Sequence, residues 1–385
     1  MTRHILFHVP APIVRHLGAA KALLEFGNAL SAFGWECDYI DREKLAPSKA
    51  EFVADYKGEH ESDWLKRHLL DHAAAYDVID YDHTCLPFSR ALFSPKPLFV
   101  ARSQLLLHSI ASSNIPIKRG LRPWIGDMLL GATRRRKLAQ KVERATTTVT
   151  EADAVLVLND DDKRVLEQIG LAPEKIAVFP NGLDARRLDA LGRTPHSKSR
   201  EPRVVFVGTF DPRKGSREFP RLVDAIIKHV PNATFRLLGT RGMYPNAESV
   251  FAEFPRALRS RIDVVPSFDS DALPALLADC SVGIFPSHLE GFGLGVLEML
   301  AAGIPVIAYN VPGPPMMLPP EYLVDRGDWR NMAAKTVALL HDSAALVRAT
   351  EWARTRSLDF QWPDIAARID RDYRSRIAAR HDASR

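Results

Sequence analysis

Short apolar runs alternate along this chain with longer stretches in which apolar residues recur at helical spacing. The first run, residues 5–9, is followed by a helical pattern of Leu23, Phe26 and Leu30 that ends at Gly34, and a second run covers 35–40. Short apolar runs with polar boundaries predict buried strands, and the order strand, helix, strand favours a parallel sheet. Further runs of this kind lie at residues 77–81, 98–101, 154–158 and 176–179.

The second half of the chain repeats this alternation. Its predicted strands are residues 204–207, 235–238, 262–265, 282–285 and 304–308. A helix is predicted at 271–277, and two helical segments are predicted after Asp328, the last at 363–377 with apolar residues at four-residue spacing. The polar, proline-bearing stretch 192–202 lies between the halves and indicates a linker. The pattern therefore predicts an α/β protein with two parallel sheets.

Composition agrees with two soluble domains. The 385 residues suffice for two domains of ordinary size, and 46% hydrophobic with 26% charged residues is typical of globular proteins. The N-terminal apolar run is too short for a signal peptide, and no stretch approaches the roughly 20 apolar residues that span a bilayer. Cys37, Cys85 and Cys280 show neither metal-ligand spacing nor a disulfide framework, so we expect a reducing, cytoplasmic environment.

The charge balance is mildly basic, with a net charge of +5. This suits an anionic substrate or an anionic membrane surface, and we find no recognition motif for nucleic acid. Residues 118–137 hold seven basic residues against Asp127 alone, with Trp124 among them. Two interpretations stay open. The segment lies peripherally on an anionic membrane, at its inner face, or it is a solvated helix whose apolar side packs on the sheet, which we favour.

The stretch 281–309 carries the clearest chemical signal. The strand 282–285 leads into a glycine-rich turn, 290–293, and then into a helical pattern that Gly303 and Pro305 close. Glycines at a helix start let backbone N–H groups face an anion, and phosphate is the usual one. Glu290 and Glu298 frame this turn and would repel phosphate, so they suit paired hydroxyls of a ribose or a hexose. The alternative is that Glu290 interacts with the helix dipole and that Glu298 is solvated.

A second anion site is predicted at the start of the second sheet. The strand 204–207 leads to Gly208 and then to Arg213, Lys214 and Gly215 before the next helix. A strand, a glycine and a lysine in this order outline a phosphate-binding turn. A surface turn rich in basic residues is the alternative.

The residue string around the glycine turn resembles the retaining glycosyltransferases of family 4, which have the GT-B architecture and a Glu-x7-Glu signature. The landmarks are Pro286-Ser287, Glu290-Gly291-Phe292-Gly293-Leu294, Leu297-Glu298 and Ala302-Gly303-Ile304-Pro305-Val306. The resemblance implies that Glu290 contacts the transferred sugar, that Glu298 binds the ribose and that the turn receives the diphosphate. Lys214 and Gly215 match the family's Lys-Gly pair. Thr209 stands where the family has an arginine. Arg213, the residue before Lys214, could supply the second positive charge.

The first half matches the family less well. Of the paired glycines that approach the diphosphate after the first strand, only Gly18 is present. The family's sugar-binding histidine aligns with Gln104, or with Ser103. His83 and His108 are nearby in sequence and could take its place, although a lone histidine is more often structural.

The resemblance thus assigns roles to a defined set of residues. It places catalysis on Lys214, Glu290 and Gln104. It places donor binding on Gly18, Gly208, Arg213, Lys214, Glu290, Gly291, Phe292, Gly293, Leu294 and Glu298. It implies two Rossmann-like domains, an acceptor domain at 1–190 and a donor domain at 191–359. A C-terminal helix, 360–385, would cross back to the first.

The implied reaction moves a hexose from a nucleotide diphosphate sugar to an acceptor hydroxyl, with retention at the anomeric carbon. Lys214, Arg213 and the N–H groups after Gly291 can stabilise the departing diphosphate without a metal. Because these groups suffice for that stabilisation, we expect no metal and no cofactor beyond the donor. The acceptor is a glycan, a lipid-linked sugar or a small molecule. A non-catalytic nucleotide-sugar binder or assembly subunit and a GT-B epimerase stay as alternatives.

Overall fold

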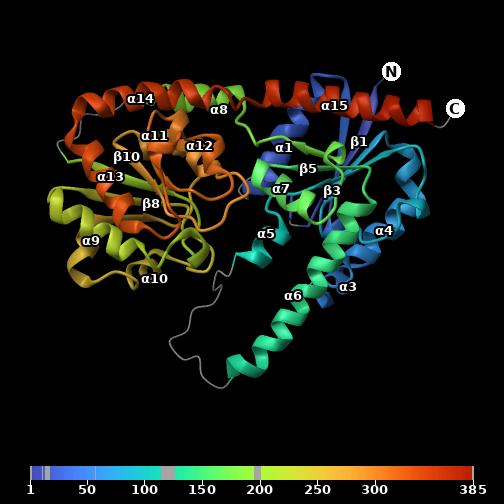
Figure 1. Ribbon diagram of the computed structural model, residues 1–385, viewed down its shortest axis with the longest axis horizontal. Helices are drawn as coiled ribbons and strands as arrows, with labels where there is room; N and C mark the ends of the chain where they lie inside the picture. The colour runs from blue at the N-terminus through green and yellow to red at the C-terminus, as the bar shows by residue number, and fades with distance from the viewer. Residues whose placement is uncertain are drawn as a thin grey trace. The chain divides into compact units, whose positions relative to one another are not determined.

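The computed structural model describes residues 2–10, 12–13, 18–56, 58–113, 126–194 and 201–383. The chain divides into two compact units. Among the described residues, the first unit comprises those up to 113, 126–181 and 362–383, and the second comprises 182–194 and 201–361. Each unit is built around its own parallel sheet (Figure 1).

The first sheet has six parallel strands in the order β2-β1-β3-β4-β5-β6. They are β1 (Arg3–Val9), β2 (Trp35–Asp41), β3 (Val78–Asp82), β4 (Leu98–Arg102), β5 (Ala154–Val157) and β6 (Ile176–Val178). All six coincide with predicted apolar runs. β2 lies on one side of β1 and β3 on the other, so the strand order changes direction between β1 and β3. In open parallel sheets, ligands bind at the carboxyl ends of the strands near such a point.

Helices cover both faces of this sheet (Figure 1). Because side chains alternate along a strand, Leu6 packs with Leu65 of α4, whereas Phe7 packs with Phe26 of α1 and Ile369 of α15. The helices of the unit are α1 (Gly18–Ser31), α2 (Arg42–Leu45), α3 (Lys49–Ala54), α4 (Glu61–His72), α5 (Leu107–Ser112), α6 (Gly126–Glu151), α7 (Asp160–Gln168) and α15 (Trp362–Ala383).

The last helix, α15, is held to the first sheet by buried polar groups as well as by its apolar face. The Arg102 guanidinium donates to both oxygens of Asp80, and the Tyr373 hydroxyl donates to Asp80 Oδ2 at 2.8 Å. Trp35 Nε1 donates to Asp370 at 2.7 Å. Buried polar groups are stable only when they are hydrogen-bonded, so these pairs fix where α15 packs.

We expect Tyr373→Phe to destabilise the protein by about 1–3 kcal/mol, since it removes one partner from a buried charged network. The ring is retained, so its packing against Trp35 stays in place. Denaturant unfolding followed by circular dichroism measures the change. Tyr322→Phe is the matched control, because that tyrosine is partly exposed and stacks on Trp352 at the surface of the second unit. An equal loss in both variants would contradict the assignment.

The second sheet also has six parallel strands, in the order β12-β11-β10-β7-β8-β9. They are β7 (Arg203–Val207), β8 (Thr234–Leu238), β9 (Ile262–Val265), β10 (Val282–Phe285), β11 (Val306–Tyr309) and β12 (Leu323–Val324). Its helices are α8 (Ala185–Gly192), α9 (Phe219–His229), α10 (Ala247–Phe251), α11 (Leu273–Leu277), α12 (Leu294–Ala301), α13 (Trp329–His341) and α14 (Ser343–Ser357). α12 packs on β7, β10 and β11, and α13 packs on β10 and β11.

Several elements differ from the expectation. Three helices follow Asp328 where two were predicted, because Asp342 ends α13 and its carboxylate caps α14 by accepting from Ala345 N at 2.8 Å. The predicted helix 271–277 begins as a 3-10 turn, Ser270–Ala272, and is α-helical only from Leu273. α8, placed in the first domain by the sequence, packs against α11 and α12 of the second unit.

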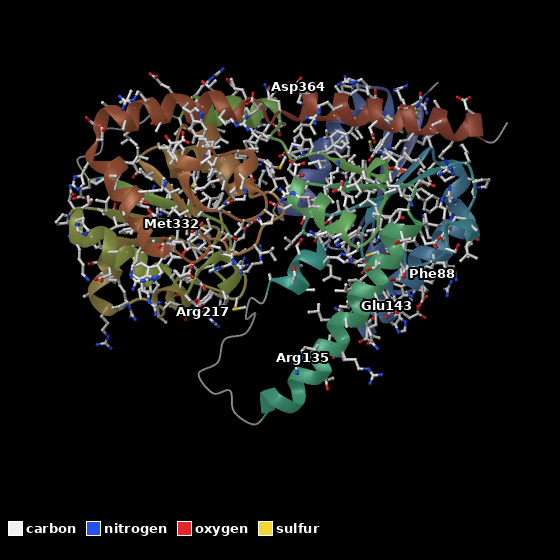
Figure 2. The ribbon with its side chains drawn as sticks, in the orientation of Figure 1. Phe88, Arg135, Glu143, Arg217, Met332 and Asp364 are labelled. Atoms are coloured by element: carbon white, nitrogen blue, oxygen red, sulfur yellow. The ribbon has the colours of Figure 1, made fainter. Side chains whose placement is uncertain are left out.

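The basic segment 118–137 is described only in part. Residues 118–125 lie outside the described part of the chain, and α6 begins at Gly126. Arg135, Arg136 and Lys137 are exposed on α6, and Figure 2 shows Arg135 and Glu143 projecting from this helix. Contact with an anionic membrane stays a prediction. None of the described helices is long and apolar enough to cross a membrane.

Candidate active site

The predicted phosphate turn forms a helix N-terminus in the second unit. β10 ends at Phe285, and α12 begins at Leu294 after Gly293, which has a left-handed conformation with φ 93°. No side chain of the described residues caps the start of α12. Its first backbone N–H groups and its positive dipole end are therefore suited to an anion.

Two glycines bring the two predicted anion turns together. Gly295, in the first turn of α12, approaches the end of β7 so closely that a Cβ there would lie 2.3 Å from Val207 O. Gly215 has φ 81°, and a Cβ there would lie 2.2 Å from Pro286 O. His288 N also donates to Arg213 O at 2.7 Å. The loops after β7 and β10 are thus in direct backbone contact.

At this contact, Lys214 and Glu290 form a largely buried ion pair. Lys214 Nζ lies 2.5 Å from Glu290 Oε1, and Ser287 Oγ donates to the same carboxylate oxygen. Arg213 Nη1 lies 3.7 Å from that oxygen and donates to Leu289 O at 3.2 Å. Three of the predicted site residues, Arg213, Lys214 and Glu290, are therefore brought together as the sequence implied.

The position of Lys214 is set by its own turn. Asp211 Oδ1 accepts from Lys214 N at 3.1 Å, and Thr209 Oγ1 donates to Asp211 Oδ2 at 2.8 Å. Thr209 thus supports the cap of the short 3-10 turn Pro212–Lys214. Sequence analysis missed the role of Asp211, although Asp followed by Pro is a common signal of a helix start.

Burial lowers the pKa of the Lys214 ammonium, the Glu290 carboxylate raises it, and the Arg213 charge lowers it, with a net lowering. An anion arriving beside Lys214 would favour the charged ammonium. A bound phosphate would therefore stabilise the ammonium in addition to Glu290 and Asp211, whose charges already raise its pKa.

Glu298 is buried on α12 and paired with Arg187 of α8. The alternative that Glu298 is solvated is therefore wrong. Asp184 caps α8 by accepting from Arg187 N at 2.7 Å, which fixes where the Arg187 side chain begins. Arg187 was missed by sequence reasoning, because neither its spacing nor its neighbours mark it as a partner of Glu298.

Other predicted donor residues lie where only their backbone can serve a ligand. The Phe292 ring is buried and packs on Phe360, with ring centroids 5.7 Å apart. Gly208 follows β7, and a Cβ there would lie 3.1 Å from the Phe206 ring. Gly291 precedes Phe292 in the turn, and Leu294 begins α12.

The remaining predicted residues belong to the first unit. Gln104 follows β4, and its Oε1 accepts from Asn181 Nδ2 at 3.2 Å. Gly18 is the first residue of α1. His83 Nε2 accepts from Leu107 N at 3.0 Å, and His108 Nε2 lies 2.9 Å from Thr146 Oγ1. Burial lowers the pKa of His108, as does the neighbouring His83. Both histidines thus have local structural contacts.

Residues 201–342 match the family model of the glycosyl transferases group 1, and they include both anion turns, Lys214, Glu290 and Glu298. Most of the second unit is therefore similar to the glycosyl transferases group 1.

Curated relatives agree with the glycosyltransferase domain. The glycogen synthase of Mycobacterium tuberculosis is 29% identical over 226 residues, 57% of this chain and 53% of that protein. The MMP alpha-(1->4)-mannosyltransferase of Mycolicibacterium hassiacum is 26% identical over 239 residues, 60% of this chain and 54% of that protein. The matches span about half the length of these relatives.

Solved structures show the fold. The sucrose-phosphate synthase of Thermosynechococcus elongatus has a TM-score of 0.76 and 21% identity, over 98% of this chain and 100% of that one. HepE of Anabaena, solved in complex with UDP-glucose, has a TM-score of 0.67 and 18% identity, over 97% and 100%. WaaG, a glycosyltransferase involved in lipopolysaccharide biosynthesis, has a TM-score of 0.66 and 15% identity, over 95% and 98%. The predicted GT-B fold is confirmed.

Proposed function

We propose that this chain transfers a hexose from a nucleotide diphosphate sugar to an acceptor hydroxyl, with retention at the anomeric carbon and without a metal in the transfer step. The observation that carries the proposal is the Lys214–Glu290 pair, which lies beside the uncapped start of α12 within a glycosyltransferase domain. The solved complexes of HepE with UDP and with UDP-glucose support this donor class.

In this mechanism the second unit binds the donor through its nucleotide diphosphate. The first N–H groups of α12, Lys214 and Arg213 bind the diphosphate, and all three stabilise the negative charge that grows on it as the glycosidic bond breaks. Glu290 exchanges part of its contact with Lys214 for hydroxyls of the transferred sugar. Glu298 accepts from the ribose hydroxyls while Arg187 fixes its carboxylate.

The acceptor proton then goes to the departing phosphate, which needs no side-chain base. Gln104 donates to and accepts from a sugar hydroxyl through its amide, but it takes no proton at neutral pH. The acceptor class, a glycan, a lipid-linked sugar or a small molecule, is part of the proposal.

The test combines binding with turnover. UDP, GDP and ADP, each free and as a hexose derivative, are screened for their effect on the thermal unfolding midpoint, since a ligand that binds the native state raises it. The stabilising sugar nucleotide is then supplied with candidate acceptors, and the anomeric configuration of the product is determined by NMR. An inverted product would exclude the retaining mechanism. A donor that binds but is never consumed would favour a non-catalytic binder.

We expect Gln104→Ala to reduce kcat/KM several-fold, because one hydrogen bond is worth about 1 kcal/mol. Gln104→His should be tolerated, since an imidazole also donates and accepts. His83→Ala and His108→Ala should have smaller effects on transfer by protein that has been shown to be folded. Turnover of the four variants with one donor and one acceptor decides this. A complete loss in either histidine variant, with Gln104→Ala active, would move the sugar-binding role to that histidine.

A further inference from the structure

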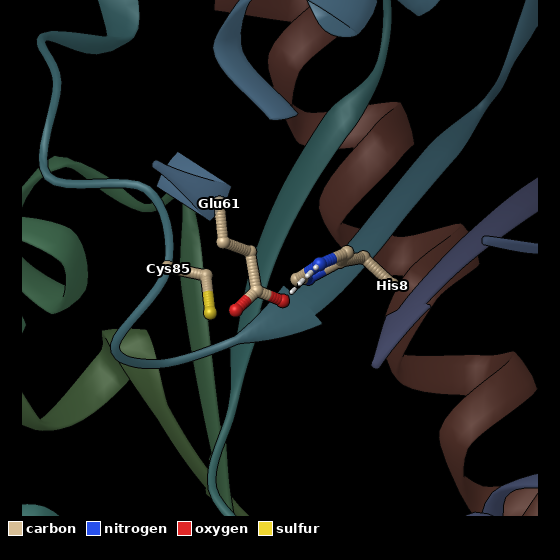
Figure 3. A group of neighbouring side chains, drawn as sticks. All are labelled: His8, Glu61 and Cys85. Atoms are coloured by element: carbon tan, nitrogen blue, oxygen red, sulfur yellow. Dashed lines mark ion pairs between the residues drawn. The ribbon is translucent and has the colours of Figure 1, made fainter. Parts of the chain in front are cut away.

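Three side chains to which the proposed function gives no role meet inside the first unit. His8 is on β1, Glu61 is the first residue of α4, and Cys85 follows β3. One ligand atom from each lies within 4.8 Å of the other two, and all three residues are buried. Figure 3 shows the Glu61 carboxylate between the His8 ring and Cys85 Sγ. A nitrogen, an oxygen and a sulfur ligand thus face one another.

The protein satisfies this cluster only in part: Cys85 Sγ lies 3.6 Å from Thr84 Oγ1 and donates to Asp82 Oδ1 at 3.9 Å. His8 is 3% exposed, and neither of its ring nitrogens hydrogen-bonds to a residue in the described part of the chain. His8 Nε2 lies 3.2 Å from Glu61 Oε1, but the contact lacks hydrogen-bond geometry, and Glu61 Oε1 has no other hydrogen bond among the described residues. Buried polar atoms are normally hydrogen-bonded, so these call for a ligand.

The place of the cluster in the fold strengthens this argument. Leu6 and His8 point to the same face of β1, and Leu6 belongs to an apolar cluster that includes Leu65 of α4 and Cys85. An aliphatic residue would suit the His8 position better if packing alone mattered. Glu61 lies in the first turn of α4, at the positive end of the helix dipole. Three such residues in an apolar layer are more easily explained by a bound cation than by packing.

The ligand types select the cation. Imidazole nitrogen, carboxylate oxygen and cysteine sulfur together suit Zn²⁺, whereas Mg²⁺ and Ca²⁺ require oxygen ligands. A tetrahedral Zn²⁺ places its ligand atoms about 3.3–3.8 Å apart, so His8 and Glu61 are already near this separation, and Cys85 Sγ needs to approach by at most about 1.5 Å.

We propose that His8, Glu61 and Cys85 bind one Zn²⁺ ion, with water in the fourth position. The Cys85 thiol loses its proton to solvent on binding, and its thiolate forms the bond to the metal. The ion joins β1, α4 and the loop after β3 at the carboxyl edge of the first sheet. Because the ligands come from positions 8, 61 and 85, no short motif reveals the site, which is why the cysteine spacing predicted none.

The first test uses Co²⁺ as a spectroscopic probe. The full chain is stripped with a chelator, dialysed and titrated with Co²⁺, and we expect one ion per chain with a thiolate-to-cobalt charge-transfer absorption that Zn²⁺ abolishes. Cys85→Ser should lose this absorption. Cys280→Ser is the matched control, because Cys280 is also a buried cysteine but lies in the second unit, and it should retain the absorption. A wild-type chain without the absorption, or a Cys85→Ser variant that keeps it, would overturn the proposal.

A second test needs no variant. Cys85 and Cys280 are both buried free thiols, so alkylation under partly denaturing conditions, followed by mass spectrometry, reports the protection of each in one sample. We expect Zn²⁺ to slow the modification of Cys85 relative to Cys280. If Cys85 is modified at the same rate with and without Zn²⁺, the metal site is refuted, and the cluster contains only an ion pair between His8 and Glu61. Neither test depends on transferase activity, so the failure of this proposal and that of the proposed function are distinguishable.

Discussion

Replacing Lys214 by alanine is expected to lower kcat by roughly a hundredfold or more while the protein stays folded. The ammonium pairs with Glu290, in the turn that leads to the uncapped start of α12, and is the largely buried cation assigned to the charge that develops on the diphosphate. One preorganised donor of this kind is worth about 2.7–4 kcal/mol in the transition state. Steady-state turnover with the donor identified by the binding screen measures the effect.

The control for this variant is Lys228→Ala. Lys228 lies on α9 of the same unit, is largely exposed and pairs only with Asp224 four residues earlier among the described contacts. The substitution removes the same charge and the same side chain at a position outside the candidate site. Turnover near that of the wild type in the Lys214→Ala protein would refute the role given to this lysine.

Glu298→Ala is expected to weaken nucleotide binding and to destabilise the second unit together. The substitution removes the carboxylate partner of Arg187, and breaking a buried ion pair typically costs about 3–5 kcal/mol. Because Glu298 is also assigned to the ribose, calorimetry with free nucleotide should show weaker binding under conditions in which the variant is still folded. Denaturant unfolding provides the stability measurement and defines those conditions.

Glu290→Ala is the comparison for this second prediction. Its carboxylate is assigned to the transferred sugar, so free nucleotide should bind with nearly unchanged affinity while transfer slows. Glu298→Gln should recover stability in part, since an amide oxygen still accepts from Arg187. If both alanine variants lose the same nucleotide affinity, the division of roles between Glu290 and Glu298 is wrong.

The strands could be predicted from sequence because a buried parallel strand is a continuous apolar run, and runs such as 204–207 and 282–285 have no competing helical pattern. β12 was missed because it has only the two residues Leu323–Val324. Only two helices were predicted after Asp328, because α13 and α14 were predicted as one. Asp342 separates them by a single residue. Local signals thus identified elements well and their ends poorly.

The candidate site was predictable where its residues are close in sequence. The glycine turn and the Lys-Gly pair are local strings, and the positive φ angles of Gly293 and Gly215 explain why those strings contain glycine. The partners that hold the functional groups come from distant positions. Arg187 meets Glu298, and His8 meets Glu61, only after the sheets have formed, so neither pair leaves a spacing in the sequence.

The attachment of α15 to the first sheet affects the order in which the units can fold. α15 follows the whole second unit in sequence, yet it supplies Ile365, Ile369 and Tyr373 to the core around β1 and β4. During synthesis, all strands of the second sheet leave the ribosome before α15 does. N-terminal units usually fold first, but here the second unit can complete its fold before the first unit does. Until α15 docks, the first sheet exposes an apolar face and the Arg102–Asp80 pair to solvent.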